Sequence, residues 1–276
     1  MLLDGIKIKE SILTTVKKDV AQLSFVPLFT DIVIGNDPAS LQYAMMKKKT
    51  AHTLGFQYTD AFFSATINEE VLVKEIQRLV SLPHMSGIII QVPVPSHLPQ
   101  QTLLDSIPMS LDVDVLSRSA QESFYKDTNE LILPAAQAVM VLLEEAKVDF
   151  LSDKFVVVGQ GLLVGKPVTH LLRKRGACVE TITDTTSETK KRELLLQADV
   201  VVSAVGIAGL ITGEMVKENV VVIDAGTLEV EGSIVGDVDV ESVAPKARFY
   251  TPTPGGVGPV TVACLFANVV ATAKKI

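Results

Sequence analysis

Tyr43 and Lys47 are four residues apart in a segment that could do acid–base chemistry. Residues 40–54 are expected to form a helix that Ser40 caps and Gly55 ends. On a helix, residues four apart share a face, so this spacing places the Lys47 amine beside the Tyr43 ring. A lysine buried beside an aromatic ring has a lowered pKa and can transfer protons. A run of three lysines is also typical of a solvated helix face, so the residues alone leave both interpretations open.

Gln91 is a polar residue inside an apolar strand that is expected over residues 87–94. A buried amide without partners costs on the order of 1–3 kcal/mol, so Gln91 must either cross-link the core or face a ligand. Pro93 and Pro95 prevent the strand from pairing further. Gln91 is therefore expected at the carboxyl end of a strand, where open α/β sheets bind their ligands.

Two other segments could face a ligand. In the first, Asp112 and Asp114 flank Val113, so an extended chain would place both carboxylates on one face, although a polar turn has the same pattern. The second, residues 251–261, holds three prolines and three glycines directly before an expected helix. This composition fixes an unusual backbone, which we expect to be shaped against a ligand.

A glycine-rich turn, residues 159–165, follows an expected buried strand and precedes an expected helix. Glycines let a backbone approach a pyrophosphate, and the helix N-terminus offers free N–H groups with a partial positive charge. The spacing G-x-G-x-x-x-G is one residue longer than the usual dinucleotide fingerprint, and a tight turn without a ligand would need the same glycines. At the end of the next strand, the acid best suited to bind ribose hydroxyls is Asp184, with Glu180 as the alternative.

Strands and helices alternate along the chain, and this alternation predicts an α/β fold. Later in the chain, buried strands are expected over residues 155–159, 177–182, 199–206 and 219–226. These strands predict a doubly wound parallel sheet. Earlier in the chain, a strand is expected over residues 26–35, and a helix is expected over residues 68–81 with Asn68 as its N-cap. That helix has an apolar stripe at Val71, Ile76, Leu79 and Val80. Further helices are expected over residues 131–147, 167–175 and 260–275.

Composition excludes several classes of protein. The chain has 276 residues and a mass of 29.7 kDa, and its 47% hydrophobic and 21% charged residues indicate an ordered globular protein. A net charge of −7 argues against nucleic-acid binding. Two cysteines cannot build a disulfide framework, and four scattered histidines indicate no metal site. We expect a cytoplasmic protein, because neither a signal peptide nor a membrane span is apparent. A mean hydropathy of +0.35 suggests apolar surface buried in an oligomer.

Several of these segments occur together, in the same order, in one family. They are Gly35–Ser40 with Tyr43 and Lys47, Gly87–Pro95, Asp112–Asp114, Val164–Pro167, Ala198–Gly206, Gly236–Asp239 and Pro254–Thr261. By these motifs, which span nearly the whole chain, the sequence resembles the bifunctional methylenetetrahydrofolate dehydrogenase/methenyltetrahydrofolate cyclohydrolases of one-carbon metabolism. The Tyr-x-x-x-Lys segment and the proline–glycine loop are the most specific parts of the resemblance.

The resemblance implies two α/β domains with a cleft between them. Residues 1–130, completed by the C-terminal helix 260–276, would form the folate-binding catalytic domain, and residues 131–259 would form a Rossmann-type dinucleotide-binding domain. Family members are typically homodimers joined through the dinucleotide domain. They transfer a hydride from 5,10-methylenetetrahydrofolate to NAD or NADP. They then hydrolyse the resulting 5,10-methenyltetrahydrofolate to 10-formyltetrahydrofolate, a product connected to purine biosynthesis.

The resemblance also implies roles for individual residues. Lys47 would be the acid–base group, Gln91 would hydrogen-bond Lys47 and keep it partly neutral, and Asp114 would bind the pterin. Tyr43 would stack on the aminobenzoyl ring of the folate. The wall between folate and nicotinamide would consist of Pro254, Gly255, Gly256 and Val257. The cofactor would contact Gly159, Gln160, Gly161, Val164, Gly165, Asp184 and Gly206.

Three segments depart from the family pattern. Residues 159–161 read Gly-Gln-Gly where the family commonly has Gly-Arg-Ser, and Asp184 stands where a serine helps to bind the NADP 2′-phosphate. An acid within ~4 Å of a phosphate charge costs up to about 4 kcal/mol at an effective dielectric constant of ~20, so we expect NAD to be preferred over NADP. Val115 replaces a glycine, and residues 134–138 replace Pro-Cys-Thr-Pro-x-Gly. These two changes affect the positioning of nicotinamide against folate, and therefore the dehydrogenase step more than the hydration step.

Three other functions stay open. The chain could be a monofunctional cyclohydrolase with a structural cofactor domain, or a non-catalytic homologue that binds folate or a dinucleotide. The retained Lys47 argues against pure binding, because binding has less need of an acid–base group. Without the resemblance, the chain could be a generic two-domain amino-acid or hydroxy-acid dehydrogenase, but Gln91 and the proline–glycine loop would then be unexplained.

Overall fold

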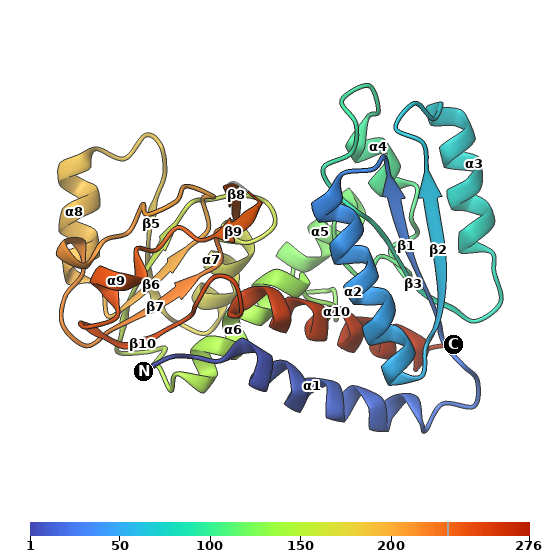
Figure 1. Cartoon of the computed structure of the whole chain (residues 1–276). Coiled ribbons are helices and arrows are strands. Elements are labelled where there is room, and N and C mark those ends of the chain that lie inside the picture. The colour runs from blue at the N-terminus through green and yellow to red at the C-terminus, as the bar shows by residue number, and fades with distance from the viewer. Residues whose placement is uncertain (231) are drawn as a thin grey trace. The chain divides into compact units, whose positions relative to one another are not determined.

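The computed structural model describes residues 1–230 and 232–276, with all side chains in these ranges except those of Pro38 and Ala39 (Figure 1). The chain divides into two compact units. One combines Met1–Glu10 with Pro134–Cys264, and the other combines Ser11–Leu133 with Leu265–Ile276. The boundaries between the units fall inside helix α1 (Gly5–Val20) and helix α10 (Val257–Ala273). Each unit has its own parallel sheet, which confirms the α/β class.

The first ten residues group with residues 134–264, whereas the domain division expected from the sequence placed them in the N-terminal domain. Backbone hydrogen bonds account for this grouping. The Leu3 N–H donates to the Tyr250 carbonyl (2.8 Å), and the Tyr250 N–H donates to the Met1 carbonyl (3.1 Å). The beginning of the chain therefore pairs with strand β10 (Ala247–Tyr250).

The unit of residues 11–133 and 265–276 contains a three-stranded parallel sheet. Its strands are β1 (Leu28–Ile34), β2 (Gln57–Phe63) and β3 (Met85–Ile90), in the order β2-β1-β3. All residues of β1 and β3 are buried, as their apolar sequences predict. Strand β3 ends at Ile90 and is shorter than expected, because Pro93 and Pro95 have no N–H groups to donate to a strand ladder.

Helices cover this sheet. Helix α2 (Pro38–Leu54) packs against β1 and β2, and helix α3 (Glu69–Val80) packs against β3. The shorter helices α4 (Gln100–Asp105) and α5 (Arg118–Tyr125) pack against each other. The last turns of α10 also belong to this core, since the Phe266 ring lies 5.4 Å from the Phe29 ring and 5.3 Å from the Phe56 ring.

The helix ends agree with the sequence analysis in part. Asn68 caps α3 and Gly55 ends α2 with a φ of 92°, as expected. The N-cap of α2 is Asp37 and not Ser40, because the Asp37 carboxylate accepts the Ser40 N–H at 2.8 Å. The apolar stripe of α3 was also partly wrong. Its buried positions are Leu72, Ile76 and Leu79, whereas Val71 is 52% exposed.

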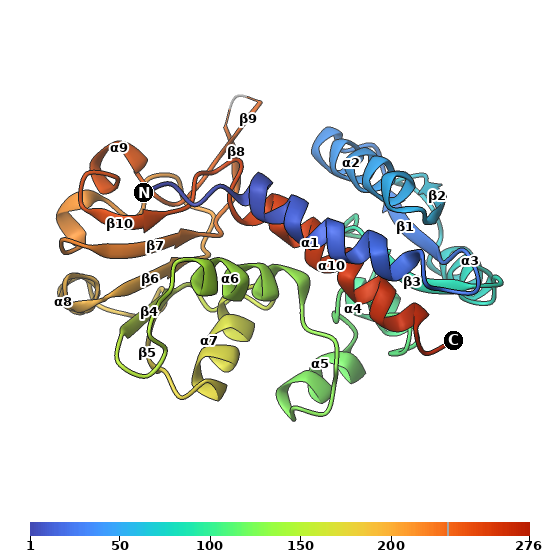
Figure 2. The ribbon, with the colours of Figure 1, turned by 90° about the horizontal axis from the view of Figure 1, so that it is seen from below.

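The unit of residues 1–10 and 134–264 contains a five-stranded parallel sheet. The strands, in the order β10-β7-β6-β4-β5, include β4 (Lys154–Val158), β5 (Cys178–Ile182), β6 (Val200–Ser203) and β7 (Val220–Asp224). Along the chain, this sheet begins at β4, adds β5 on one side as an edge strand, and then adds β6, β7 and β10 in turn on the other side. The reversal of direction confirms the doubly wound sheet (Figure 2).

Helices lie on both faces of this sheet, because right-handed connections to opposite sides place their helices on opposite faces. Helix α6 (Pro134–Glu145) packs against α7 (Gly165–Lys174). Helices α8 (Glu188–Gln197) and α9 (Val240–Val243) both contact the short 3-10 helix η1 (Gly213–Met215). One core cluster contains side chains from both the strands and α8, including Val156, Val201, Val222 and Leu194.

A two-stranded antiparallel hairpin, β8 (Leu228–Val230) and β9 (Ser233–Val235), was not expected from the sequence. It extends away from the five-stranded sheet (Figure 2). Its apolar side chains Leu228, Val230 and Ile234 are exposed, so the period-2 burial that marks a packed strand is missing. Among the helices that the structure describes, none combines the length and apolar character needed to cross a membrane.

Candidate active site

Lys47 is buried, with only 1% of its surface exposed. Its amine lies 2.8 Å from Oε1 of Gln91 and 2.7 Å from Oδ2 of Asp31, and it lies over the Tyr43 ring at 5.1 Å from the ring centre. The interpretation of Lys47 as part of a solvated helix face is therefore wrong. Its neighbour Lys48 does lie on that solvated side, where it pairs with Asp60.

Strand register explains why these groups meet. Asp31 of β1 is paired with Asp60 of β2 on one side and with Ile89 of β3 on the other. Residues in register share a face of the sheet, and so do residues two apart on one strand. Gln91 follows Ile89 by two positions and therefore lies on the same face as Asp31. Helix α2 packs against this sheet and carries Tyr43 and Lys47.

Asp31 is a member of the site that the sequence analysis missed. The signal was available, because a carboxylate inside the apolar run Leu28–Ile34 needs a partner as much as Gln91 does. Burial raises the pKa of Asp31, and the charge of Lys47 opposes that rise. Oδ1 of Asp31 is buried without a hydrogen-bond partner, and the Tyr58 hydroxyl reaches Oδ2 only at 3.4 Å.

Asp112 and Asp114 have different roles, so the expectation of two carboxylates on one face is wrong. Residues 111–114 form a turn in which Asp112 makes an isolated bridge to Ile88, and they do not form a strand. The Asp112 carboxylate accepts the N–H groups of Leu116 (3.0 Å) and Ser117 (2.8 Å) and holds the following backbone. Burial raises the pKa of Asp114 to about 7, although the nearby Lys47 charge lowers it. Asp114 therefore changes its charge near neutral pH and is the member of this pair that lies close to Lys47.

The Asp114 turn continues into Val115, which is fully buried and has a φ of 59°. A β-branched residue in this left-handed region is strained. Ala136 and Ala138, from the second segment that departs from the family pattern, are fully buried in α6. All three residues fill the interiors of their units.

The glycine-rich turn lies in the other unit, at the carboxyl end of β4. A Cβ on Gly159 would lie 2.4 Å from the Ala204 carbonyl oxygen, and a Cβ on Gly165 would lie 2.0 Å from the Gly159 oxygen. Close packing therefore requires both glycines. Gly161 has open space where its Cβ would be, and the N-cap residue of α7, Val164, makes no side-chain capping bond. The turn lies where the sheet changes direction, which is the usual ligand position in such sheets.

Gln160 and Asp184 lie near the ends of neighbouring strands. The Gln160 amide donates to Oγ1 of Thr169 (3.1 Å) and to its neighbour's carbonyl, so its side chain is held against α7. Asp184 is exposed and follows the carboxyl end of β5, whereas Glu180 lies within that strand. The structure therefore places Asp184, and not Glu180, at the strand end where an acid can bind ribose hydroxyls.

Asp237 organises the loop that follows β6 and contains Gly206. Its carboxylate is fully buried and accepts four hydrogen bonds, each of 2.7 or 2.8 Å. The donors are the Ser203 hydroxyl and the N–H groups of Val205, Gly206 and Ile207. Asp224 in turn accepts the Asp237 N–H, and burial raises the pKa of Asp224 to about 6. Asp237 belongs to the Gly236–Asp239 motif, but the residues alone indicated no role for the carboxylate of Asp237 or of Asp224.

The proline–glycine loop lies in the same unit as the glycine-rich turn. Gly255 has a φ of 106°, and its carbonyl accepts the Gly5 N–H at 3.0 Å. A Cβ on Gly256 would lie 2.5 Å from the Pro252 carbonyl oxygen, so this position has no room for a side chain. Pro254 follows a cis peptide bond, and Val257 begins α10. The loop is thus fixed by backbone packing, as its composition predicts.

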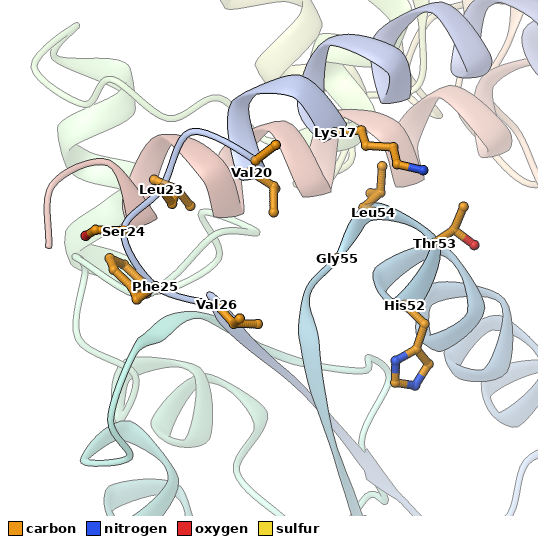
Figure 3. Close-up of a pocket in the computed structure, with 11 residues that line it drawn as sticks. Lys17, Val20, Leu23, Ser24, Phe25, Val26, His52, Thr53, Leu54 and Gly55 are labelled. Carbon is orange, nitrogen blue, oxygen red and sulfur yellow. The ribbon is translucent and has the colours of Figure 1, made fainter.

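A pocket of about 510 Å³ lies elsewhere in the unit of residues 11–133 (Figure 3). Its lining includes Lys17 and Val20 of α1, Phe25 before β1, and His52 at the end of α2. Lys47, Gln91 and Asp114 do not line it. The predicted site residues and this pocket are therefore separate features.

Comparison with known proteins identifies the relatives of this chain. A family model described as the catalytic domain of tetrahydrofolate dehydrogenase/cyclohydrolase matches residues 3–114, and the NAD(P)-binding domain model of the same family matches residues 134–276. The bifunctional protein FolD of Hydrogenobaculum sp. is 36% identical over 276 residues, covering 99% of both chains. The protein of the same name from Lactobacillus acidophilus is 38% identical and covers 98% of this chain and 93% of its own.

Solved structures of enzymes with these names are also similar to this chain over its full length. The bifunctional FolD enzyme of Campylobacter jejuni is 31% identical, with a TM-score of 0.95 and coverage of 100% of this chain and 99% of its own. The methylenetetrahydrofolate dehydrogenase–cyclohydrolase of Trypanosoma brucei, solved with NADP and an inhibitor, is 30% identical, with a TM-score of 0.94 and coverage of 100% and 97%.

The four hydrogen bonds to Asp237 lead to a test of its role. We expect Asp237→Asn to lower the free energy of unfolding by at least about 2 kcal/mol, because an amide NH₂ would face backbone N–H groups that then lack an acceptor. The amides of Val205, Gly206 and Ile207 should exchange faster with solvent in a hydrogen-exchange measurement. Asp239→Asn is the control, since Asp239 bonds only to residue 242 among the hydrogen bonds described for its carboxylate. Unchanged exchange in Asp237→Asn would contradict this role.

Proposed function

The chain belongs to the tetrahydrofolate dehydrogenase/cyclohydrolase family, and from that premise we propose that Lys47 is the acid–base group of its hydrolytic step. The observation that carries this proposal is the burial of the Lys47 amine between Gln91 and Asp31, beside the Tyr43 ring. A buried amine with fixed partners has the defined orientation that proton transfer needs.

As a member of this family, the chain is an enzyme with two activities. It oxidises 5,10-methylenetetrahydrofolate to 5,10-methenyltetrahydrofolate with a nicotinamide cofactor, and it hydrolyses the product to 10-formyltetrahydrofolate. In hydrolysis, water adds to the cationic methenyl carbon and loses a proton, and one carbon–nitrogen bond then breaks as the nitrogen gains a proton. Lys47 is proposed to accept and return these protons, with Gln91 fixing its amine.

Asp114 and Tyr43 are proposed to bind the folate. Asp114 has a pKa of about 7 and so carries a full negative charge only above neutral pH, when its carboxylate would accept hydrogen bonds from the pterin amino group and ring nitrogen. Tyr43 lies half-buried beside Lys47 and would stack on the aminobenzoyl ring. Both residues belong to the same unit as Lys47.

The dinucleotide is proposed to bind at the carboxyl ends of β4, β5 and β6. Gly159 and Gly165 permit the tight turn, and the open space at Gly161 together with the uncapped α7 N-terminus would receive the phosphates. Asp184 would bind ribose hydroxyls, and the turn residues Gln160 and Val164 and the loop residue Gly206 would complete the contacts. The bound nicotinamide supplies the hydride acceptor, and residues 254–257 would form the wall between it and the folate.

NAD is proposed as the preferred cofactor. Gln160 is neutral and bonded to Thr169, so residue 160 offers no positive charge to a 2′-phosphate. Asp184 follows β5 as an exposed acid and would repel that phosphate. The solved relative from T. brucei holds NADP, so this preference concerns the present chain and not the family.

Two substitutions test the site, because one is expected to lower the rate of hydrolysis and the other to weaken folate binding. Lys47→Met should lower the rate of methenyltetrahydrofolate hydrolysis at least about a hundredfold while folate still binds, because general acid–base catalysis contributes roughly 10²–10⁴-fold. Asp114→Asn should weaken folate binding at pH 8 and remove its pH dependence, because wild-type binding should weaken as pH falls below about 7 and Asp114 gains a proton. Turnover and folate dissociation constants measured from pH 6 to 9 give both results.

Lys48→Met is the control for Lys47, because Lys48 lies on the same helix and pairs with Asp60 on its exposed side. We expect it to retain wild-type hydrolysis. Full hydrolytic turnover in Lys47→Met would remove Lys47 from the mechanism. Folate affinity in the wild type that stays constant across pH 7 would argue against Asp114 as the pterin ligand.

The cofactor preference is tested by dissociation constants for NAD and NADP. The wild type should bind NAD more tightly, and Asp184→Ser should improve NADP binding relative to NAD by up to about a thousandfold, the factor that corresponds to about 4 kcal/mol. Glu180→Ser is the control, since Glu180 is exposed on the same strand but lies before its carboxyl end. Tighter binding of NADP than of NAD by the wild type would contradict the preference.

A cytoplasmic homodimer that supplies 10-formyltetrahydrofolate for purine biosynthesis is the proposed physiological form. Leu228 and Val230 are exposed on one face of the β8–β9 hairpin, and Ile234 is exposed on the other. These apolar side chains support a dimer through the dinucleotide-binding unit in which a partner covers the hairpin, since exposed apolar surface commonly marks an interface.

The dimer is tested by the mass in solution. We expect about twice the 29.7 kDa of one chain by light scattering, and Ile234→Asp should shift the protein towards the single-chain mass because it places a charge in an apolar interface. Val71→Asp changes an equally exposed apolar residue on α3 and should leave the mass unchanged. A wild-type mass of one chain would overturn this proposal.

A further inference from the structure

The Lys47 amine has two hydrogen-bond acceptors of different charge. The Gln91 amide oxygen at 2.8 Å is neutral, whereas the Asp31 carboxylate at 2.7 Å carries a negative charge when ionised. The side chain of Asp31 is 0% exposed and that of Lys47 is 1% exposed, so water does not screen this pair. A charge so close and so poorly screened has a strong effect on whether the amine holds its proton.

The pair also fixes the direction of the amine. An ammonium group has three N–H bonds. Asp31 and Gln91 accept two of them from positions on β1 and just after β3, two strands paired in the same sheet. This arrangement leaves one N–H direction for a reacting atom. Gln91 alone would leave the amine free to rotate about that single hydrogen bond.

We propose that Asp31 is a positioning residue for Lys47, and that its negative charge favours the protonated amine over the neutral amine and so sets the pH range in which Lys47 exchanges protons with the folate. This proposal rests on the proposed acid–base role of Lys47. In this proposal the acid–base group is the Asp31–Lys47 pair, and Gln91 accepts a hydrogen bond from the amine. The other oxygen of Asp31, Oδ1, makes no hydrogen bond, so Lys47 is the main compensation for the buried carboxylate.

Other titratable groups face the pair and must be separated from it. Tyr58 and Asp60 approach from β2, Tyr43 lies on α2 itself, and Asp114 lies on the turn. Asp114 has a pKa of about 7 and is the one whose titration would overlap a neutral-pH profile. The kinetic comparison is therefore made both in the wild-type and in the Asp114→Asn background.

The first experiment reads the proton on Lys47 directly. The side-chain ¹⁵N resonance of Lys47, assigned by its absence in Lys47→Met, is followed by NMR as pH is raised in the wild type and in Asp31→Asn. Loss of the carboxylate should move the midpoint of the Lys47 titration to lower pH by about one to three units, the usual effect of a close opposite charge. Equal midpoints in the two proteins would overturn the proposal.

The second experiment asks whether the same proton matters in turnover. The Lys47-dependent limb of the pH–rate profile for methenyltetrahydrofolate hydrolysis should move to lower pH in Asp31→Asn by the same amount as the NMR midpoint. Asp60→Asn, which changes the acid in register on the next strand, should leave the limb in place. An NMR shift without a kinetic shift would overturn the claim that the pair sets the pH range, and it would also count against the catalytic role of Lys47. No NMR shift would count against Asp31 alone.

A stability measurement covers the case in which Asp31→Asn does not fold. Lys47→Met leaves the Asp31 charge buried and unpaired, so Asp31→Asn/Lys47→Met should be at least as stable as Lys47→Met in urea at pH 7. A double variant that is less stable than Lys47→Met would mean that Asp31 does not need the lysine charge, and it would overturn the proposal.

Discussion

Burial of the Lys47 charge is the constraint around which the smaller sheet is arranged. A charge removed from water needs acceptors at fixed positions, and here one comes from the middle of β1 and the other from the residue after β3. The parallel register that places Asp31 opposite Ile89 is therefore also the geometry of the site. The sheet and helix α2 do not merely support the amine, because any change in register would separate it from its acceptors.

In the larger sheet, the groups that need acceptors are backbone N–H groups of the loops that follow the strands, and buried carboxylates supply these acceptors. Asp237 accepts three backbone N–H groups and a hydroxyl, and Asp224 accepts the N–H groups of Gly226, Asp237 and Val238. The two buried carboxylates thus hold the loops after β6 and β7. Gly226 and Gly236 are needed beside them, since a Cβ at either position would lie about 2 Å from a carboxylate oxygen.

Much of the fold follows from local pattern. Apolar runs predicted β1, β3, β4 and β7, and the alternation of strands and helices predicted the doubly wound sheet. The predictions failed where two residues could fill the same role, or where the role of a residue depended on groups distant in sequence. Asp37 and Ser40 can both cap a helix, and only backbone geometry selects Asp37. Asp31 lay unnoticed in an apolar strand, because its lysine partner is distant in sequence. Asp112 and Asp114 look equivalent until the turn separates them, and the exposed β8–β9 hairpin has no alternating core face to reveal it.

Val115 has a consequence for how freely this chain can change. Its fully buried side chain fills space directly after Asp114, while its left-handed backbone costs of order 1–3 kcal/mol that the surrounding packing must offset. Whole domains are stable by only about 5–15 kcal/mol. The unit that carries Lys47 therefore holds a smaller reserve against further destabilising substitutions than its packed core suggests, and its mutational tolerance is correspondingly narrow.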